Sequence, residues 1–338
     1  MKVLVTGGAG FVGCHVANHF ASKGHEVTIF DNLSRKGVDK NLAWLKENHG
    51  DKIRYIIGDV RNYNEISEAC KGQEVIYNYA AQVAVTTSVT DPRTDFEINA
   101  FGTFNTLEAA RNYGDNPIFL VTSTNKVYGG MEDVNIIEKN NRYEYDGLPF
   151  GVPESRGLDF HSPYGCSKGT ADQYVHDYSR IYGLRSVVFR MSCIYGTHQF
   201  GNEDQGWVAY FIIASILGKP ITIYGDGKQV RDVLYVEDLV RAMELAALNI
   251  DKTAGQIYNI GGGIENTLSV WNEFHPILKK LLGHDVPVSF GDWRPGDQKV
   301  YISDTRKAQR DLGWKPQISV EEGITRIFNW VKENPGLF

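Results

Sequence analysis

The chain of 338 residues is long enough for about two domains with buried cores, because a typical domain holds roughly 150 residues. Its net charge of −6, spread without long runs of one sign, argues against nucleic acid or an anionic membrane as a partner. No apolar stretch approaches the roughly 18 residues of a spanning helix, and the first residues turn glycine-rich before a signal-peptide core could form, which predicts a cytoplasmic protein.

Short runs of β-branched residues alternate with longer segments of helical period, the pattern of βαβ units and a parallel sheet. We expect strands at residues 2–6, 26–30, 53–57, 74–78, 118–122 and 185–190. Helices are expected between them, at residues 11–23 and 63–70, within 92–113, and at 163–182. Parallel strands covered on both faces make a doubly wound α/β domain of the Rossmann type.

After residue 190 this rhythm loosens, and turn-forming clusters appear at residues 201–206 and 225–227. This change predicts a smaller, discontinuous α/β lobe. Residues 1–192 and about 228–262 would form the first domain, and about 193–227 and 263–338 the second. The segment 129–160 shows no clear period, and we expect an irregular lid there, because a long loop in a compact enzyme is usually functional.

The first predicted strand runs directly into the segment GGAGFVG at residues 7–13 and then into a helix. Glycines there allow a tight turn whose backbone N–H groups bind a pyrophosphate. Asp31 ends the next strand, where it would bind an adenosine ribose and repel a 2′-phosphate; this favours NAD over NADP, although Arg35 and Lys36 weaken the preference. Asp59 follows the third strand and could instead cap a helix. The predicted cofactor residues on these strand ends are Gly7, Gly10, Phe11, Val12, Gly13, Asp31, Asn32, Asp59, Val60, Ala80, Ala81, Gln82 and Thr122.

Tyr164 and Lys168 stand one turn apart, on one face of the helix that Pro163 opens. A phenol with an ordinary pKa near 10 is about one part in a thousand ionised at pH 7, a deficit of roughly 4 kcal/mol for a base. A fixed ammonium and the positive ring of NAD⁺ would reduce that deficit by charge attraction. Thr124 ends the preceding strand and brings a hydroxyl to the same sheet edge. Taken alone, a Tyr-x-x-x-Lys pattern is more often a solvated helix face.

With these motifs the sequence resembles the extended short-chain dehydrogenase/reductase family, whose members modify nucleotide sugars, over nearly the whole chain. Within that family it is most similar to the CDP-tyvelose/CDP-paratose 2-epimerases, in STNKVYG at 123–129, LDFHSPYGCSKG at 158–169, DQGWV at 204–208 and GKQVRD at 227–232. The resemblance implies that Tyr164 is the acid/base and that Lys168 binds the nicotinamide ribose. It further implies that Thr124 bonds the sugar hydroxyl and that Asn99 supports the backbone and waters near the lysine.

The family's 4,6-dehydratases carry an Asp-Glu pair directly after the threonine, whereas this sequence has Asn125 and Lys126. Loss of water is therefore disfavoured, because no acid stands ready to protonate the leaving hydroxide. The resemblance implies instead an isomerase that uses tightly bound NAD and inverts C2 of a CDP-linked hexose or deoxyhexose through a transient 2-keto sugar. It also implies a homodimer. The alternatives are a UDP-hexose 4-epimerase or another nucleotide-sugar oxidoreductase of the same fold and, from a different class, a non-catalytic NAD-binding module.

On the substrate side, Arg231 and Arg294 are the candidates for the diphosphate, because a guanidinium fork matches phosphate oxygens in pairs. Surface ion pairs with neighbouring aspartates are the alternative. The segment QGWV at residues 205–208 forms either a nucleobase slot or the start of an ordinary core helix. The full set of predicted substrate residues is Gln82, Thr86, Thr124, Asn125, Lys126, Tyr164, Gln205, Val208, Tyr224, Arg231 and Arg294.

Three other patterns are discounted. The segment GCSKG at 165–169 matches the nucleophile elbow of hydrolases, but Pro163 places Ser167 in the first turns of a helix rather than after a strand. His15 and His19 have the spacing of metal ligands on a helix, yet no third ligand accompanies them, so we expect no metal. The 4 cysteines lack zinc-site or scaffold spacing, and we expect them to be reduced, buried thiols.

Overall fold

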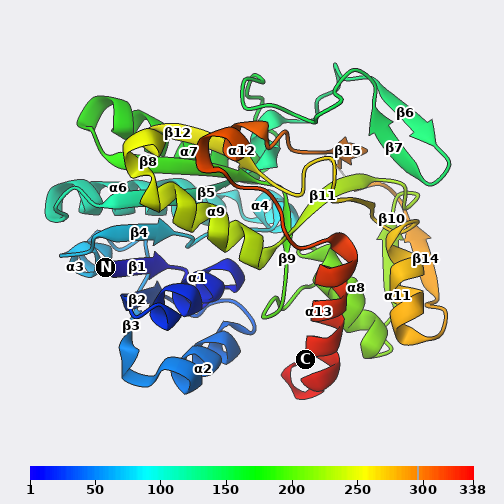
Figure 1. The fold of residues 1–338 in the computed structure, drawn as a ribbon, viewed down its shortest axis with the longest axis horizontal. Coiled ribbons are helices and arrows are strands. Elements are labelled where there is room, and N and C mark those ends of the chain that lie inside the picture. The colour runs from blue at the N-terminus through cyan, green and yellow to red at the C-terminus, as the bar shows by residue number, and fades with distance from the viewer. Residues whose placement is uncertain (295–296) are drawn as a thin grey trace.

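A sheet of seven parallel strands forms the centre of the computed structural model, which describes residues 1–294 and 297–338 (Figure 1). The strand order is β12-β8-β5-β4-β1-β2-β3, so the predicted doubly wound sheet is confirmed. The seventh strand, β12, lies outside the six predicted runs. The strands are β1 (Lys2–Thr6), β2 (Glu26–Asp31), β3 (Ile53–Ile57), β4 (Val75–Asn78), β5 (Ile118–Thr124), β8 (Arg185–Met191) and β12 (Gln256–Ile260).

Helices cover both faces of this sheet, which explains why its strands are apolar on both sides. Val5 and Ile29 point into the core on one face, whereas Leu4 and Phe30 point into the core on the other. The first core is closed by α1 (Phe11–Ser22), α2 (Val38–His49), α9 (Val236–Leu248), α10 (Ile250–Thr253) and α12 (Arg306–Leu312). The second is closed by α3 (Tyr63–Cys70), α6 (Gly102–Tyr113) and α7 (Ser162–Tyr182).

The long helix predicted within residues 92–113 is interrupted. A π-turn at Glu97–Phe101 joins α5 (Pro92–Phe96) to α6, and the short α4 (Val85–Thr90) precedes them. The wider turn contains Asn99, whose side chain bonds Ser167 of α7 at 3.1 Å. The interruption therefore joins this part of the chain to the helix that carries Tyr164 and Lys168.

The smaller lobe, on the right of Figure 1, is assembled from segments far apart in the sequence. Its strand β11 (Val230–Tyr235) pairs with β9 (Cys193–Tyr195), β13 (Thr267–Ser269) and β15 (Val300–Tyr301), while β10 (Ile221–Tyr224) pairs with β14 (Val288–Gly291). The helices α8 (Trp207–Ile216), α11 (Phe274–Leu282) and α13 (Val320–Glu333) share one apolar core with these strands. The segment 228–262, expected in the first domain, is divided, because β11 joins this lobe and β12 joins the large sheet. The domain boundaries stay a prediction.

The segment 129–160 is not irregular throughout, because it contains an antiparallel hairpin of β6 (Ile136–Lys139) and β7 (Arg142–Tyr145). The backbone N–H of Tyr143 donates to the Lys228 carbonyl at 3.1 Å, and the Tyr145 hydroxyl donates to the Val300 carbonyl at 2.8 Å. These contacts dock the hairpin on the smaller lobe. The hairpin was not predicted because every residue of β6 is exposed, so its sequence does not alternate between apolar and polar residues.

The cysteines do not share one environment. Cys14 and Cys70 are buried and Cys193 is half-buried, but Cys166 is exposed, so the prediction of buried thiols is wrong for Cys166. That residue lies on the outer face of the first turns of α7, where helical geometry turns it away from its buried neighbours Gly165 and Ser167. Within residues 1–294 and 297–338, the helices are all too short or too polar to cross a bilayer.

Candidate active site

The glycine segment forms a tight cradle between β1 and α1. Gly7 has a positive φ of 63°, and a Cβ on Gly13 would lie 2.2 Å from the Gly7 carbonyl oxygen, so only glycine fits at both positions. Gly10 precedes α1 without any side chain to cap the first helical N–H groups. Those N–H groups and the positive end of the helix dipole are therefore available to an anion, which fits the diphosphate of a dinucleotide.

Asp31 and Asp59 lie at the same edge of the sheet in different environments. Asp31 accepts the backbone N–H of Ala9 at 3.0 Å and that of Leu33 at 2.8 Å, which fixes the cradle and the loop after β2, while burial raises its pKa. Asp59 accepts from Asn32 at 2.9 Å, and hydrogen bonds from Arg61 lower its pKa to about 2. Asp59 does not cap α3, since Asn62 occupies that position.

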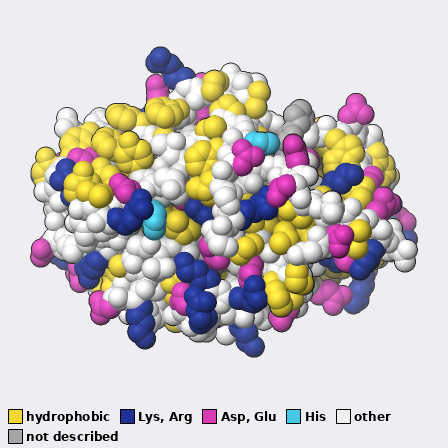
Figure 2. Space-filling model, turned by 90° about the horizontal axis from the view of Figure 1, so that it is seen from above, with side chains coloured by type: hydrophobic (Ala, Val, Ile, Leu, Met, Phe, Trp, Pro, Cys, Tyr) yellow, Lys and Arg dark blue, Asp and Glu magenta, His cyan; other side chains and the backbone are white. Residues whose placement is uncertain are grey.

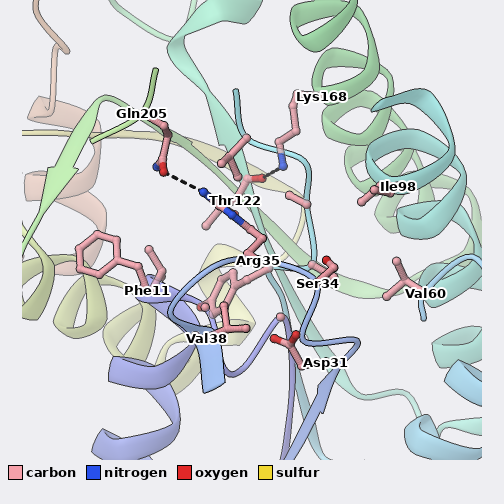
Figure 3. A pocket seen from close by; sticks show the side chains of 18 of the residues that line it. Phe11, Asp31, Ser34, Arg35, Val38, Val60, Ile98, Thr122, Lys168 and Gln205 are labelled. Atoms are coloured by element: carbon pink, nitrogen blue, oxygen red, sulfur yellow. Dashed lines mark hydrogen bonds between the residues drawn. The ribbon is translucent and has the colours of Figure 1, made fainter. Parts of the chain in front are cut away.

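The three predicted catalytic side chains, Thr124, Tyr164 and Lys168, line one cavity with the glycine cradle. Lys168 is almost fully buried and donates to the Thr122 carbonyl at 2.6 Å, a bond drawn in Figure 3. Burial lowers its pKa to about 8, against the opposing effect of Asp172 and Asp95.

Burial raises the pKa of the Tyr164 phenol to about 12, while a hydrogen bond with the Thr124 hydroxyl and the charge of Arg35 act in the opposite direction. The phenol thus holds its proton at neutral pH in the protein alone. Ionising it requires further positive charge beside it, which a cationic ring in the same cavity would provide.

A buried polar network supports the helix that carries Tyr164 and Lys168. The carboxylate of Asp95, which is fully buried, accepts from the Ser167 hydroxyl at 2.5 Å and from the Asn99 amide at 3.1 Å. Gln82 belongs to this network, because its amide donates to Asp95 at 3.0 Å and its backbone N–H donates to Asn99 at 2.9 Å. The sequence analysis missed Asp95, since an acidic residue near a helix start is common and carries no signal of its own.

Most of the predicted cofactor residues meet at this cavity, but two of them do not line it. Gln82 and Asn99 lie behind its wall, in the Asp95 network. The predicted residues that line the cavity are Gly7, Gly10, Phe11, Val12, Gly13, Asp31, Asn32, Asp59, Val60, Ala80, Ala81, Thr122, Thr124, Tyr164 and Lys168.

Ser167, His15 and His19, which were discounted as a nucleophile and as metal ligands, each contact another residue of the chain. Ser167 is buried within α7 and bonded to Asp95. The His15 ring is hydrogen-bonded with the Thr197 carbonyl at 2.9 Å, and the His19 ring lies 3.0 Å from the Glu244 carboxylate.

A second cavity lies beside the first and is bordered mainly by the smaller lobe; we call it the nucleotide cavity. Val208 does not line it, because its side chain is 2% exposed in the core of the smaller lobe. Asn125 is also absent from its wall and instead contacts Gln298 at 3.5 Å. The predicted substrate residues that line the nucleotide cavity are Thr86, Lys126, Gln205, Tyr224, Arg231 and Arg294. Aromatic side chains of α8 that the sequence analysis did not single out, Trp207, Tyr210 and Phe211, line it as well.

The cations of the nucleotide cavity are gathered around carboxylates. Arg231 lies 3.4 Å from Asp297, and Arg294 lies 3.5 Å from Asp204 while its guanidinium stacks on the Tyr224 ring at 4.0 Å. Burial and the neighbouring Arg231 lower the pKa of Lys126 to about 8. A diphosphate entering this cavity would replace carboxylates as the partner of these cations. Pro295 and Gly296, next to Arg294 in the predicted motif, lie outside the described residues.

Comparison with known proteins places this geometry in a family. Residues 4–327 match the model described as GDP-mannose 4,6 dehydratase. The chain belongs to this family of extended short-chain dehydrogenases/reductases. The predicted membership is thus confirmed, and so is its character as an enzyme that uses NAD, the dinucleotide that the cradle fits.

Several relatives of this family cover the chain almost completely. The CDP-paratose 2-epimerase of Salmonella typhi is 43% identical over 337 residues, covering 98% of this chain and 99% of that protein. The structure of a UDP-glucose 4-epimerase of Thermotoga maritima with UDP-glucose is 31% identical with a TM-score of 0.84, covering 99% and 100%. A dTDP-glucose 4,6-dehydratase of Streptomyces venezuelae, solved with NAD bound, is 30% identical with a TM-score of 0.85, covering 100% and 99%.

Proposed function

We propose that the protein is a nucleotide-sugar epimerase that inverts C2 of a CDP-linked hexose or deoxyhexose. The main support is that Thr124, Tyr164 and Lys168 line a cofactor cavity that borders the nucleotide cavity. The substrate assignment rests on the 43% identity with the CDP-paratose 2-epimerase over nearly both chains. Asn125 and Lys126 support it further, because they supply no acid for the dehydration performed by other family members.

The reaction needs an oxidation before C2 can invert. C2 of the sugar is not next to a carbonyl, so its C–H bond is too weakly acidic for direct proton abstraction. NAD, which the glycine cradle and Lys168 would hold, would supply the acceptor for the hydride of C2 and the donor that returns it to the opposite face. Tyr164 would accept the proton of the C2 hydroxyl and give it back. Because the hydride also returns to the carbon that it left, no net redox change would result.

The other side chains of the site control that proton. Thr124 bonds the phenol and lowers its pKa, and it would bond the sugar hydroxyl as well. Lys168 is held by the Thr122 carbonyl, which leaves its other N–H donors for the ribose of the cofactor. Arg231 and Arg294 would bind the diphosphate and so hold the sugar beside Tyr164.

The proposal is tested by incubating the holoenzyme with CDP-glucose, and separately with UDP-galactose, in D₂O and following the products by NMR. We expect inversion at C2 of the CDP sugar without deuterium at C2, because the hydride returns directly. Deuterium at C2 would contradict hydride return and indicate proton abstraction.

A UDP-hexose 4-epimerase is the second candidate, favoured by the structural likeness to the Thermotoga maritima enzyme along the whole chain. In the same experiment it predicts C4 inversion of UDP-galactose and an inert CDP sugar. A non-catalytic NAD-binding module predicts that neither sugar reacts and that Tyr164→Phe changes nothing.

We further infer a cytoplasmic homodimer that pairs through α6 and α7. Aromatic side chains are exposed together along these helices and the preceding π-turn, and such clusters mark interfaces. Figure 2 shows hydrophobic side chains gathered at the end of the molecule that carries α6 and α7. The exposed residues are Phe101, Phe104, Tyr113, Tyr174, Ile181 and Tyr182. Light scattering on the purified protein would give twice the chain mass, and Tyr174→Glu would shift it to the monomer.

A further inference from the structure

Arg35 extends from the loop after β2 into the cofactor cavity. In Figure 3 its side chain lies among the lining residues, and a dashed line joins it to Gln205. Arg35 Nη2 donates to Gln205 Oε1 at 3.0 Å, although the two residues are 170 positions apart. We call this pair the Arg35–Gln205 strap. The strap links the large-sheet domain to the turn before α8 in the smaller lobe.

Both ends of the strap are held by short-range hydrogen bonds. On one side, Leu33 N–H donates to Asp31 at 2.8 Å and Ser34 N–H donates to Asn32 at 3.1 Å, which shapes the loop up to Arg35. On the other, Asn202 and Gln205 exchange backbone hydrogen bonds of 3.0 and 3.2 Å. The strap therefore joins two preformed turns, so closing it costs side-chain freedom but little backbone freedom.

Arg35 differs from the other arginines of the site in its charge balance. Arg231 and Arg294 lie beside carboxylates, whereas Arg35 forms no ion pair with any residue in the described ranges, and its bonded partner Gln205 is neutral. A guanidinium carries five N–H donors, and Gln205 takes one of them. Asp31 attracts the guanidinium from beyond ion-pair distance, so the charge and the remaining donors of Arg35 stay available in the wall of a cavity that would hold the anionic diphosphate of a dinucleotide.

Gln205 connects the Arg35–Gln205 strap to the nucleotide cavity. Among the residues that the structure describes, Gln205 is the only one that lines both cavities. Its turn is also fastened on the far side, because Arg294 donates to the Glu203 carbonyl at 3.1 Å and the Tyr224 hydroxyl donates to the Glu203 carboxylate at 2.5 Å. A nucleotide that contacts Tyr224 or Arg294 therefore acts on the same turn that carries one end of the strap.

We propose that the Arg35–Gln205 strap retains the dinucleotide and couples its retention to occupancy of the nucleotide cavity. The inference rests on the proposed function in one respect, the choice of a CDP sugar as occupant. An epimerase that oxidises and then reduces the same carbon must keep its cofactor while the keto sugar is present. A strap that tightens when the nucleotide is bound meets that requirement.

The experiment measures release of bound NAD from the holoenzyme after dilution, alone and with saturating CDP or UDP, using cofactor content after rapid gel filtration as the readout. For the wild type we expect CDP to slow the release. Arg35→Met should release NAD about tenfold faster without nucleotide. The variant removes the hydrogen bonds that the guanidinium would donate to the dinucleotide, and one hydrogen bond to a charged group contributes about 1.4 kcal/mol or more to binding. Gln205→Ala should make release insensitive to CDP. Lys36→Ala, which removes an exposed neighbouring charge, is the matched control and should behave as wild type.

Reciprocity gives a second readout that does not depend on turnover. If CDP tightens NAD, then NAD must tighten CDP by the same factor, and this factor should fall to one in Gln205→Ala. Arg35→Lys keeps the positive charge but loses the forked donors of the guanidinium. It replaces Arg35→Met as the test variant if Arg35→Met fails to fold. Wild-type release rates in both Arg35 variants would overturn the strap. Retardation by UDP but not CDP would support the strap and contradict the proposed substrate, so the two failures are distinguishable.

Discussion

Lys168 in the cofactor cavity and the two arginines of the nucleotide cavity have different partners. In the cofactor cavity, Lys168 is buried against a neutral carbonyl, and its pKa is lowered to about 8. In the nucleotide cavity, Arg231 and Arg294 already lie beside Asp297 and Asp204.

This difference indicates two modes of binding. In the cofactor cavity, the glycine cradle and the ammonium of Lys168 already line one space, and the ammonium is held by a carbonyl rather than a carboxylate. If the nucleotide cavity binds a diphosphate as proposed, the diphosphate must displace these carboxylates, so its affinity is a difference between two electrostatic energies. The following experiments test that contrast.

Tyr164→Phe should have the largest effect. Removing the hydroxyl eliminates the proton acceptor of the cofactor cavity but keeps the ring, so turnover should fall by roughly 10²–10⁴-fold. Bound NAD and the melting temperature should stay near wild type. Tyr174→Phe, which removes a hydroxyl from the same helix but keeps the ring on the proposed dimer face, is the control and should retain activity. Retained turnover in Tyr164→Phe would remove Tyr164 from the mechanism.

Lys168→Met tests the desolvated ammonium through stability. Burial lowers the pKa of Lys168 from 10.5 to about 8, so the charged form destabilises the native state below pH 8. Between pH 8 and 10.5 the unfolded chain keeps the proton that the native state has lost, and stability rises with pH. Relative to Lys168→Met, the cofactor-free wild type should gain up to about 3 kcal/mol of unfolding free energy from pH 7 to 10. Denaturant titrations at both pH values measure this, and parallel pH profiles would contradict it.

Gly13→Ala tests the preformed cradle. The new Cβ would stand 2.2 Å from the Gly7 oxygen, so the loop must shift at a cost of about 1–3 kcal/mol. We expect NAD affinity to fall by about ten- to a hundredfold, measured by calorimetry, with CDP affinity unchanged. Gly157→Ala, which meets no atom within 4 Å, is the control. Wild-type NAD affinity in Gly13→Ala would show that the cradle tolerates a side chain.

Asp297→Asn should give the smallest effect of these variants, and it should strengthen ligand binding rather than weaken it. It removes the carboxylate that competes with the diphosphate for Arg231, so CDP should bind a few-fold more tightly, as expected for a partly exposed ion pair. Calorimetry with CDP at low and high salt checks this. Asp292→Asn, exposed and outside the cavity wall, is the matched control. Weaker CDP binding in Asp297→Asn would indicate that the carboxylate orients Arg231 rather than competing for it.

Local spacing was sufficient to predict that the glycine segment, Asp31, Tyr164 and Lys168 would line one cavity. The glycine segment and Asp31 lie within one strand-turn-helix-strand unit, and Tyr164 and Lys168 lie on one helix, so their relative positions follow from backbone geometry. The fold class followed in the same way, because alternating strand and helix periods leave few arrangements of a parallel sheet.

Spacing failed where a residue's role depends on distant partners. Gln82 follows a strand end but turns to Asp95, and Val208 follows a glycine turn but packs in the core of the smaller lobe. The β6–β7 hairpin was missed because its first strand is exposed and carries no apolar alternation.

Most strands of the large sheet, the dinucleotide cradle and the spacing of Tyr164 and Lys168 are thus determined by neighbouring residues, because helix and strand geometry converts sequence separation into distance. The nucleotide cavity and the Arg35–Gln205 strap are not. They bring together segments far apart in the sequence, 170 positions in the strap and 208 between Thr86 and Arg294 in the nucleotide cavity, and no local rule states which turn will meet which loop until the two lobes have packed against each other.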